Sequence, residues 1–489
     1  MSRSIKSGIL MVFSGKFGDM LLGALITPLL VRYLGEAQYG DYAFVLSIIL
    51  MTGLLTSPVV SVGLRKFLAE NRPLQHWADR VYGFFTRLGI IIASAFALII
   101  FLSLQSESIR EILQDGTVLY IYVAIFVIMS KQMFSISINT LRGLKQERYS
   151  EPLFVVRKLI FGLIALVLIY YGWGVTGVLL GEIVGLLVAA LVGTYFIHKY
   201  LDLDYILKID KNLPKHELVK FSIGNVILMS LVASLYHIDL LLLNPISGSE
   251  QTGYYKGALI IVEFLWFAPI AVQTVMIQSA SELWDSGQIS EINQLSSRLT
   301  RYVLLFTGLL SIGLASLVQD LVPLYLGSSF TPSVLPILIL IPGALGFATA
   351  RPIYSIGQAK GNYRPIIVAT AGAAILNVFL NLILIPRHGM IGAATATSIS
   401  YGIMFFCHLA SARVIGFNPL QDLRPVRLLT TIAISGILIS ILSGLILSPY
   451  LSLLIIPPIG LVIFLIMSLL TGALDKSEME SIINSAYIK

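Results

Sequence analysis

Two oppositely charged residues, Lys16 and Asp19, lie inside an apolar stretch that runs from Gly8 to Arg32. A helix over this stretch, at about 1.5 Å per residue, is long enough to cross the roughly 30 Å hydrocarbon layer of a bilayer. An ionisable group at that depth costs on the order of 3 kcal/mol to insert, so it usually faces a protein interior or an aqueous cavity. Because Lys16 and Asp19 are three residues apart, they can also neutralise each other as a structural pair. Both interpretations, cavity lining and structural pair, stay open.

Two carboxylates in later apolar stretches are candidates for ion coupling. Glu263 lies deep in one stretch, six residues before Pro269, and Asp239 lies toward the end of another. Proline breaks the local hydrogen-bond ladder of a helix, and kinked polar spans tend to line cavities. A carboxyl group in such a place suits a switch driven by H+ or Na+.

Three more cations, Arg32, Lys131 and Arg351, lie in or near apolar stretches. Each is a candidate for a protein interior or an aqueous cavity. For Lys131 and Arg351 the competing interpretation is a long side chain that reaches the nearer membrane surface.

The composition is that of a polytopic membrane protein. The chain has 489 residues, of which 56% are hydrophobic and 12% charged, and its mean hydropathy is +0.87. Soluble domains carry about 25% charged residues. With one cysteine, Cys407, no intramolecular disulfide can form.

Long apolar runs separated by polar or Gly/Pro turns predict an all-α integral membrane protein with about 14 transmembrane helices. The expected spans are 8–32, 40–63, 82–104, 117–139, 153–172, 175–197, 221–244, 254–280, 302–325, 332–355, 364–385, 390–412, 427–447 and 450–472.

The distribution of positive charge predicts the orientation. With a cytoplasmic N-terminus, most of the 33 Lys and Arg residues fall in inner loops and termini, Arg157 and Lys158 among them. By the positive-inside rule both termini then lie in the cytoplasm of a multi-pass protein of the cell (inner) membrane. The rule also explains the net charge of +7 without a nucleic acid partner.

An internal repeat relates two sets of six spans. Gln38 and Gly40 in the first set match Gln251 and Gly253 in the second. Independently, the Gly-x-x-Gly that begins at Gly174 recurs at Gly389, and the separation of these two copies is nearly the same as that of the first pair. Six spans separate the copies, an even number, so both have the same orientation, as in two-lobed transporters with parallel repeats.

The expected domains follow from this repeat. They are an N-lobe (1–197), a cytoplasmic amphipathic linker (198–220), a C-lobe (221–412), and two C-terminal helices with a cytoplasmic tail (413–489). The linker alternates apolar and charged residues, which favours a helix on the inner membrane surface.

Energising and catalytic motifs are absent from the sequence. There is no Gly-x4-Gly-Lys-Ser/Thr and no His/Cys/carboxylate cluster with metal-ligand spacing. We therefore expect no catalytic residue, metal or cofactor. The Asp202-Leu203-Asp204 triplet resembles a metal-binding motif of some glycosyltransferases, but one such triplet in a charged inner loop is weak evidence.

Two motifs resemble those of a known family. Residues 32–42, RYLGEAQYGDY, resemble the RYLGxxxYGxY after the first helix of polysaccharide flippases of the multidrug/oligosaccharidyl-lipid/polysaccharide (MOP) superfamily. Residues 377–386, NVFLNLILIP, with the following Gly389 and Gly392, resemble the LNxxLNxxLIPxxGxxGAAxAT of the same family. The eighth span is also similar to its counterpart.

The resemblance implies two six-helix lobes around a V-shaped cavity that alternates between inward- and outward-facing states. The cargo would be a polyprenyl-linked oligosaccharide, whose lipid tail stays among the membrane lipids while the anionic head group crosses. Cavity cations bind that head group in such flippases, and Lys16 best matches the role, with Arg32, Lys131 and Arg351 as weaker candidates. The first helix lacks the many arginines of lipid II flippases, which disfavours a peptidoglycan precursor.

Three alternatives remain. A proton- or Na+-coupled multidrug or cation antiporter of the same superfamily predicts a carboxylate-dominated cavity, and Asp19, Glu182, Asp239 and Glu263 fit it. An integral-membrane glycosyltransferase would need Asp202 and Asp204 for metal-dependent sugar transfer. A membrane scaffold would tolerate neutralisation of Lys16 and Asp19.

Overall fold

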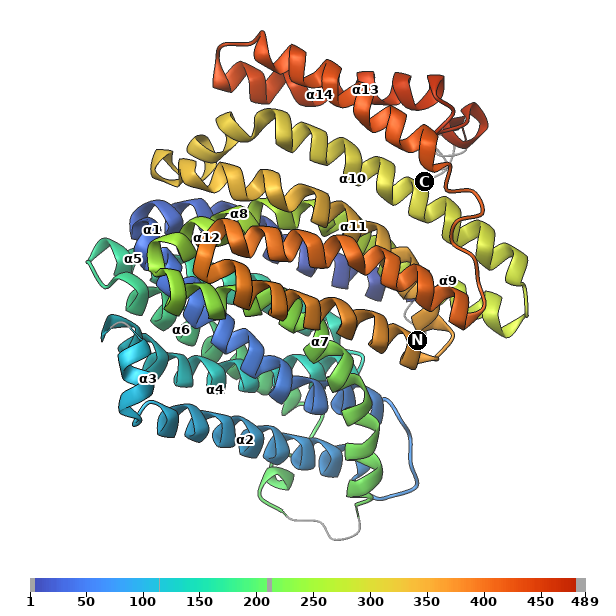
Figure 1. The fold of residues 1–489 in the computed structure, drawn as a ribbon. Helices are drawn as coiled ribbons and strands as arrows, with labels where there is room; N and C mark the ends of the chain where they lie inside the picture. Colours follow the sequence, from blue (N-terminus) through green and yellow to red (C-terminus); the bar gives the residue numbers. More distant parts are fainter. Residues whose placement is uncertain (1–4, 114, 209–212, 481–489) are drawn as a thin grey trace. The chain divides into compact units, whose positions relative to one another are not determined.

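The computed structural model describes residues 5–113, 115–208 and 213–480, which are almost entirely helical (Figure 1). The chain divides into two compact units, unit 1 (Met1–Gly253) and unit 2 (Tyr254–Lys489). The prediction of an all-α protein is confirmed.

Unit 1 is a bundle in which α1 is the common neighbour. α1 packs against α2, α4, α5, α6 and α7, and α6 also packs against α4 and α5. Its elements are α1 (Ile5–Phe67), α2 (Trp77–Ser103), α3 (Glu107–Ile112), α4 (Asp115–Gly143), α5 (Glu147–Tyr170), α6 (Gly174–Ile197), η1 (Leu203–Ile206), α7 (Lys215–Ser247) and the start of α8 (Ser249–Glu263). Fully buried side chains such as Phe67, Phe85 and Leu141 form its core.

Unit 2 is centred on α11, which packs against α9, α10 and α12. A second group forms where α13 and α14 pack against each other and against α10. The elements after α8 are η2 (Phe264–Trp266), α9 (Phe267–Asp285), α10 (Ile289–Tyr325), η3 (Ser328–Ser333), α11 (Val334–Ala359), α12 (Tyr363–Ile415), α13 (Pro425–Gly444) and α14 (Pro449–Leu470).

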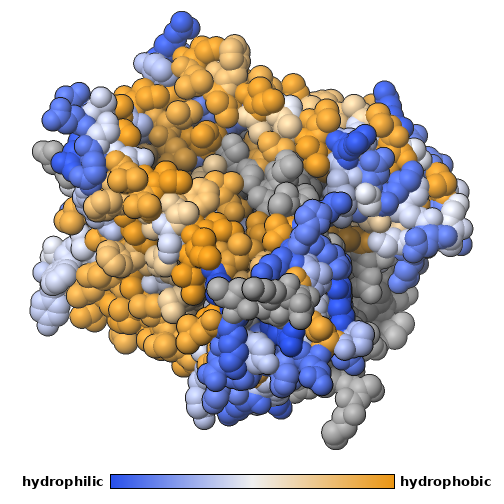
Figure 2. Space-filling model, turned by 90° about the horizontal axis from the view of Figure 1, so that it is seen from below, coloured by the Kyte–Doolittle hydropathy of each residue, from blue (hydrophilic) through white to orange (hydrophobic). Residues whose placement is uncertain are grey.

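The helices suit a membrane by length and by surface. Eleven helices in the described part of the chain are long and apolar enough to cross a bilayer. Large apolar side chains such as Leu98, Leu163 and Phe406 are exposed, and Figure 2 shows a broad hydrophobic band with hydrophilic side chains gathered toward its edges. Apolar surface of this extent is stable in lipid and not in water. The chain is a multi-pass membrane protein, and the count of fourteen crossings stays a prediction.

Glycines with positive φ interrupt the helices at positions that have the repeat spacing. Gly35 bends α1 with φ 71° and ψ 178°, and its repeat counterpart Gly248 ends α7 with φ 87° and ψ 169°. Gly174 begins α6 with φ 50°, and Gly389 bends α12 with φ 53°. Glycine adopts such angles without steric cost. The match in backbone geometry supports the internal repeat.

A close backbone contact within unit 1 also follows the repeat. A Cβ on Gly40 of α1 would overlap the carbonyl oxygen of Ser249, and a Cβ on Gly253 would overlap the carbonyl oxygen of Glu36. Ser249 corresponds to Glu36 in the repeat, as Gly253 corresponds to Gly40. The two contacts are therefore exchanged by the repeat, and each needs a glycine.

The linker differs from the expected surface helix. Between Ile197 and α7 the described residues form only the short turn η1, and residues 209–212 lie outside the described part. Asp202 accepts a hydrogen bond from the backbone of Asp204 at 3.0 Å, and Arg87 of α2 donates to three carbonyl groups, those of Tyr205, Ile206 and Lys208. Because side chains satisfy the backbone here, a turn competes successfully with a helix.

Candidate functional site

A cluster of charged side chains occupies the interior of unit 1, with Arg157 of α5 at its centre. The Arg157 Nη2 donates to Asp19 Oδ1 of α1 at 3.0 Å, and its Nη1 donates to Glu182 Oε1 of α6 at 2.8 Å. The exposed fractions are 15% for Arg157, 32% for Asp19 and 19% for Glu182. One guanidinium therefore ties three helices together through charge-assisted hydrogen bonds.

Two lysines and a tyrosine complete this cluster. Lys131 of α4 lies within electrostatic range of Arg157 and Glu182, and so does Tyr42 of α1. Lys158 of α5 interacts with Asp19, Arg157 and Glu182. Among described residues, the cluster contains three cations and two carboxylates, a net positive charge. The name interior cluster is used below for Asp19, Lys131, Arg157, Lys158 and Glu182.

The small residues of α1 make room for the two lysines. The Nζ of Lys131 lies 3.3 Å from the point that a Cβ on Gly53 would occupy, and the Nζ of Lys158 lies 3.8 Å from the corresponding point on Gly23. A larger side chain at Gly53 would displace the Lys131 ammonium group. Both lysines therefore lie against α1, inside the bundle.

Arg157 and Lys158 correct the sequence prediction, which placed them in an inner loop. α5 begins at Glu147, so Arg157 lies ten residues, or about 15 Å, inside the helix. Glu182 in the next helix could have indicated the interior position of Arg157, because a buried carboxylate needs a cation nearby.

Of the expected pair of Lys16 and Asp19, the structure describes only the Asp19 side chain. Asp19 binds Arg157. Lys16 belongs to α1, but its side chain lies outside the described part of the structure. Cavity lining and pairing by Lys16 both stay predictions.

Unit 2 holds a buried cation of a different kind. Arg351 of α11 is 5% exposed, and its Nη1 donates to Gln273 Oε1 of α9 at 3.1 Å. Its guanidinium lies 4.0 Å from the ring centroid of Phe347. A buried side chain does not extend to a membrane surface, so the surface-reaching interpretation of Arg351 is wrong.

Aromatic rings surround this arginine. The ring of Phe347 packs against Trp266 at 4.7 Å and Tyr401 at 4.8 Å between centroids. His408 of α12, 1% exposed, packs edge-on against Tyr354 at 5.6 Å. The name aromatic site is used below for Arg351, Gln273, Phe347, Trp266 and Tyr401.

The remaining predicted residues are separate from these clusters. Arg32 is exposed on α1, three residues before the bend at Gly35, and Asp239 is buried in α7 at 1% exposure. Glu263 ends α8, is 42% exposed, and lies 3.8 Å from Lys256. As expected from Pro269, the helix is interrupted there, by η2.

The motif residues of α12 have structural contacts. Asn377 and Asn381 are fully buried, and Asn381 donates to Asn377 at 3.2 Å. Asn377 and Tyr255 of α8 both donate to Thr397 of α12, at 3.3 and 3.1 Å. This network joins α8 to both halves of α12. Within residues 5–113, 115–208 and 213–480, no three His, Cys, Asp or Glu residues are grouped as a metal site.

Comparisons with known proteins agree with this architecture. Residues 5–276 match the family model described as Polysaccharide biosynthesis protein. An uncharacterized membrane protein of Methanocaldococcus jannaschii, MJ1068, is 25% identical over 70% of this chain and 69% of its own length.

Two solved structures have similar folds. The lipid II flippase MurJ in an inward closed conformation has a TM-score of 0.76 at 16% identity, over 94% of this chain and 98% of that chain. An inward-facing multidrug resistance MATE family transporter of the MOP superfamily has a TM-score of 0.68 at 13% identity, over 81% of this chain and 95% of that chain.

Proposed function

The chain belongs to the polysaccharide biosynthesis protein family and has the fold of MOP-superfamily transporters, and from this premise we propose which cargo it moves. It is a transporter and not an enzyme. Its cargo is a polyprenyl-phosphate- or pyrophosphate-linked oligosaccharide. The protein moves this cargo from the cytoplasmic to the outer leaflet by alternating access, for the synthesis of cell-surface glycans.

The observation that carries the proposal is the net positive charge of the interior cluster. An anionic head group that leaves water needs fixed positive charge and hydrogen-bond donors. Lys131, Arg157 and Lys158 supply both from two helices of unit 1, and the two carboxylates hold the arginine in place. The proposed substrate contacts are Lys16, Asp19, Arg32, Lys131 and Arg351.

The proposal includes a topology. Counted with the bends at Gly35 and Gly389 as turns, α1 and α12 each supply two crossings, so the eleven long apolar helices supply thirteen. Helix α7, which contains the expected span 221–244, makes fourteen. Both termini are cytoplasmic. The lobes are 1–197 and 221–412, with the linker 198–220 between them and the pair of helices in 413–489 outside the repeat.

The test is mass spectrometry of the lipid-linked glycan pool in cells depleted of the protein. Completed lipid-linked units should accumulate in the inner leaflet, where a membrane-impermeant lectin cannot reach them. Re-expressed wild-type protein should remove the accumulated units, and Lys131→Ala should remove few of them. Lys220→Ala, which changes an exposed lysine in α7, should remove them as wild type does. A pool that depletion leaves unchanged contradicts the proposal.

A proton- or Na+-coupled antiporter of drugs or cations is the second candidate, favoured by the two interior carboxylates Asp19 and Glu182. Glu263 and Asp239 are the further proposed coupling residues. In proteoliposomes, an antiporter would release protons or Na+ when a cationic drug is added, and Glu182→Gln would abolish that exchange. A flippase without antiport would show no such release.

A further inference from the structure

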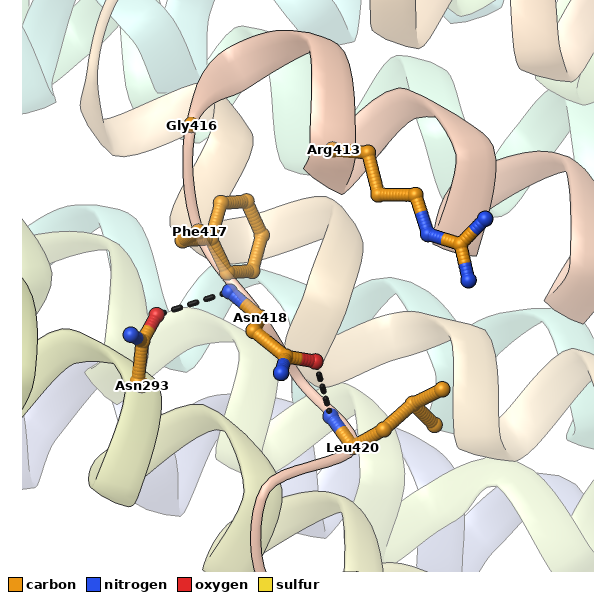
Figure 3. Close-up of a pocket in the computed structure, with 6 residues that line it drawn as sticks. All are labelled: Asn293, Arg413, Gly416, Phe417, Asn418 and Leu420. Atoms are coloured by element: carbon orange, nitrogen blue, oxygen red, sulfur yellow. Dashed lines mark hydrogen bonds between the residues drawn. The ribbon is translucent and has the colours of Figure 1, made fainter.

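A cavity of about 490 Å³ lies at the end of α12 in unit 2 (Figure 3). It is separate from the aromatic site and contains none of the residues proposed for transport. One lining residue comes from α10 and the others from the end of α12 and its connection to α13: Asn293, Arg413, Gly416, Phe417, Asn418 and Leu420.

Two carboxamide side chains of this cavity keep an available hydrogen-bond donor. The Asn293 Oδ1 accepts from the backbone N–H of Asn418 at 2.7 Å, and the Asn418 Oδ1 accepts from the backbone N–H of Leu420 at 3.0 Å. Both carboxamides are thereby oriented, because only their oxygens can accept (Figure 3). No described residue accepts a hydrogen bond from either Nδ2, so both amide groups remain able to donate.

The charge of the cavity is positive. Arg413 is exposed, and no ion pair or hydrogen bond joins its side chain to another described residue. The Nζ of Lys360 lies 3.9 Å from the point that a Cβ on Gly416 would occupy. None of the described lining residues is acidic, and nearby Asp422 already binds Arg301 at 3.1 Å and Arg424 at 2.9 Å.

The floor of the cavity is rigid. Phe417 is 4% exposed and packs edge-on against Trp284 at 6.2 Å. Trp284 in turn donates from Nε1 to the carbonyl of Ile356 at 3.1 Å and lies 4.3 Å beneath the Lys360 ammonium group. Lys360 also donates to the carbonyl of Ile415, the last residue of α12. A site whose walls are fixed before binding loses less entropy when a ligand arrives.

The position of the cavity points to the membrane surface. The apolar helix α12 ends at Ile415, directly beside the cavity. Leu420 lines it at 38% exposure, and Val414, the residue after Arg413 in the chain, is 73% exposed. A ligand with an anionic head and an apolar tail would contact Arg413 and these side chains together.

We propose that this cavity binds a phosphate group, supplied by the head group of an anionic membrane phospholipid or by free phosphate. The planar guanidinium of Arg413 matches two phosphate oxygens, and the Nδ2 group of Asn418 donates to a third. The exposed Val414 and Leu420 favour the phospholipid.

The test is native mass spectrometry of the full-length protein from nanodiscs of phosphatidylglycerol and phosphatidylcholine, with inorganic phosphate as competitor. Wild type should retain phosphatidylglycerol, and Arg413→Ala should lower its retention about tenfold, the loss expected for one charge-assisted contact. Asn418→Asp preserves the acceptor for Leu420 but puts a carboxylate in the cavity, and should lower retention at least as much.

Arg364→Ala is the matched control, because Arg364 is an exposed arginine in the first turn of α12. If Arg364→Ala retains the same amount of phosphatidylglycerol as Arg413→Ala and Asn418→Asp, the proposal is overturned, because general surface charge would then explain binding. Displacement of phosphatidylglycerol by millimolar phosphate, in wild type only, would identify free phosphate as a ligand of the same site. If phosphate does not displace phosphatidylglycerol but Arg413→Ala lowers its retention, the ligand is the phospholipid.

Discussion

Arg157 of unit 1 and Arg351 of unit 2 are held by different kinds of group. In unit 1, Arg157 is bound by two carboxylates from neighbouring helices. In unit 2, Arg351 donates to the neutral amide of Gln273 and lies on the ring of Phe347. Carboxylates cancel the charge of the cation, whereas an amide and an aromatic ring stabilise it and leave the charge in place.

The difference gives the two arginines different roles, a structural one for Arg157 and the proposed ligand-binding one for Arg351. The Arg157 guanidinium joins α1, α5 and α6, so its first role is to hold unit 1 together, and the lysines beside it provide the excess charge. The Arg351 guanidinium donates to one neutral amide and lies on an aromatic ring, and neither of these two groups carries a negative charge.

The largest effect is expected for Arg157→Met, because it leaves Asp19 and Glu182 in the interior without their cation. Removing one member of a buried pair costs about 3–5 kcal/mol, and the partial exposure of these groups reduces this to about 2–3 kcal/mol. Thermal unfolding of the purified protein measures the loss. Adding Asp19→Asn and Glu182→Gln to Arg157→Met should restore most of the stability, and a single variant as stable as wild type would contradict the structural role.

A smaller loss is expected for Arg351→Leu. The variant removes the hydrogen bond to Gln273 and the cation–π contact with Phe347, which together are worth about 1–2 kcal/mol. If Arg351 contacts the cargo, the lipid-linked glycan pool should fail to recover although the protein folds. Arg351→Lys, which keeps the charge, should recover part of the transport. Full transport by Arg351→Leu would remove Arg351 from the substrate contacts.

Gln273→Glu gives Arg351 a carboxylate partner of the kind that Arg157 has. The desolvation of a new carboxylate offsets most of its attraction to Arg351, so the free energy of unfolding should change by less than about 1 kcal/mol. Transport should nevertheless fall severalfold, because the cation is now neutralised. Gln273→Met, which has no charge, is the control. Equal transport by Gln273→Glu and wild type would show that the charge of Arg351 is not used.

The smallest effect is expected at an exposed pair in unit 2, where Arg424 donates to Asp475 at 2.7 Å. This hydrogen bond lowers the pKa of Asp475 below its ordinary value of 3.8. The pair therefore stabilises the protein at neutral pH, and the stabilisation is lost as the pH falls through the lowered pKa. Asp475→Asn should cost at most about 0.5 kcal/mol at pH 7. Melting curves of variant and wild type should converge as the pH falls below 3.8, and a difference that grows in acid would contradict this.

The helices and their turns could be predicted from the sequence because each depends on local composition. The breaks expected between 8–32 and 40–63, and between 364–385 and 390–412, coincide with the bends at Gly35 and Gly389. The cost of charge in lipid made Asp19 and Lys131 candidates for an interior position, although pairing with Lys16 and a side chain that reaches the membrane surface were the competing interpretations. The structure places both residues near Arg157.

Arg157 itself could not be placed by the rule that counts positive charge in loops, because that rule ignores partners from other helices. Its two carboxylates lie 138 and 25 residues away in the sequence, and only packing brings them together. Gln273 of the aromatic site was missed for a similar reason, since a single amide in an apolar helix has no pattern of its own. The turn at η1 depends on Arg87, which belongs to α2, far earlier in the chain.

The reciprocal contact of Gly40 and Gly253 bears on the ancestry of the chain. Gly40 contacts Ser249 and Gly253 contacts Glu36, so each segment makes the same contact with the other. This is the pattern of a two-fold interface between identical subunits. A half-length ancestor that paired with itself would have formed this contact with one glycine instead of two. Duplication and fusion of its gene would then have doubled the glycine, and the close backbone contact requires both copies.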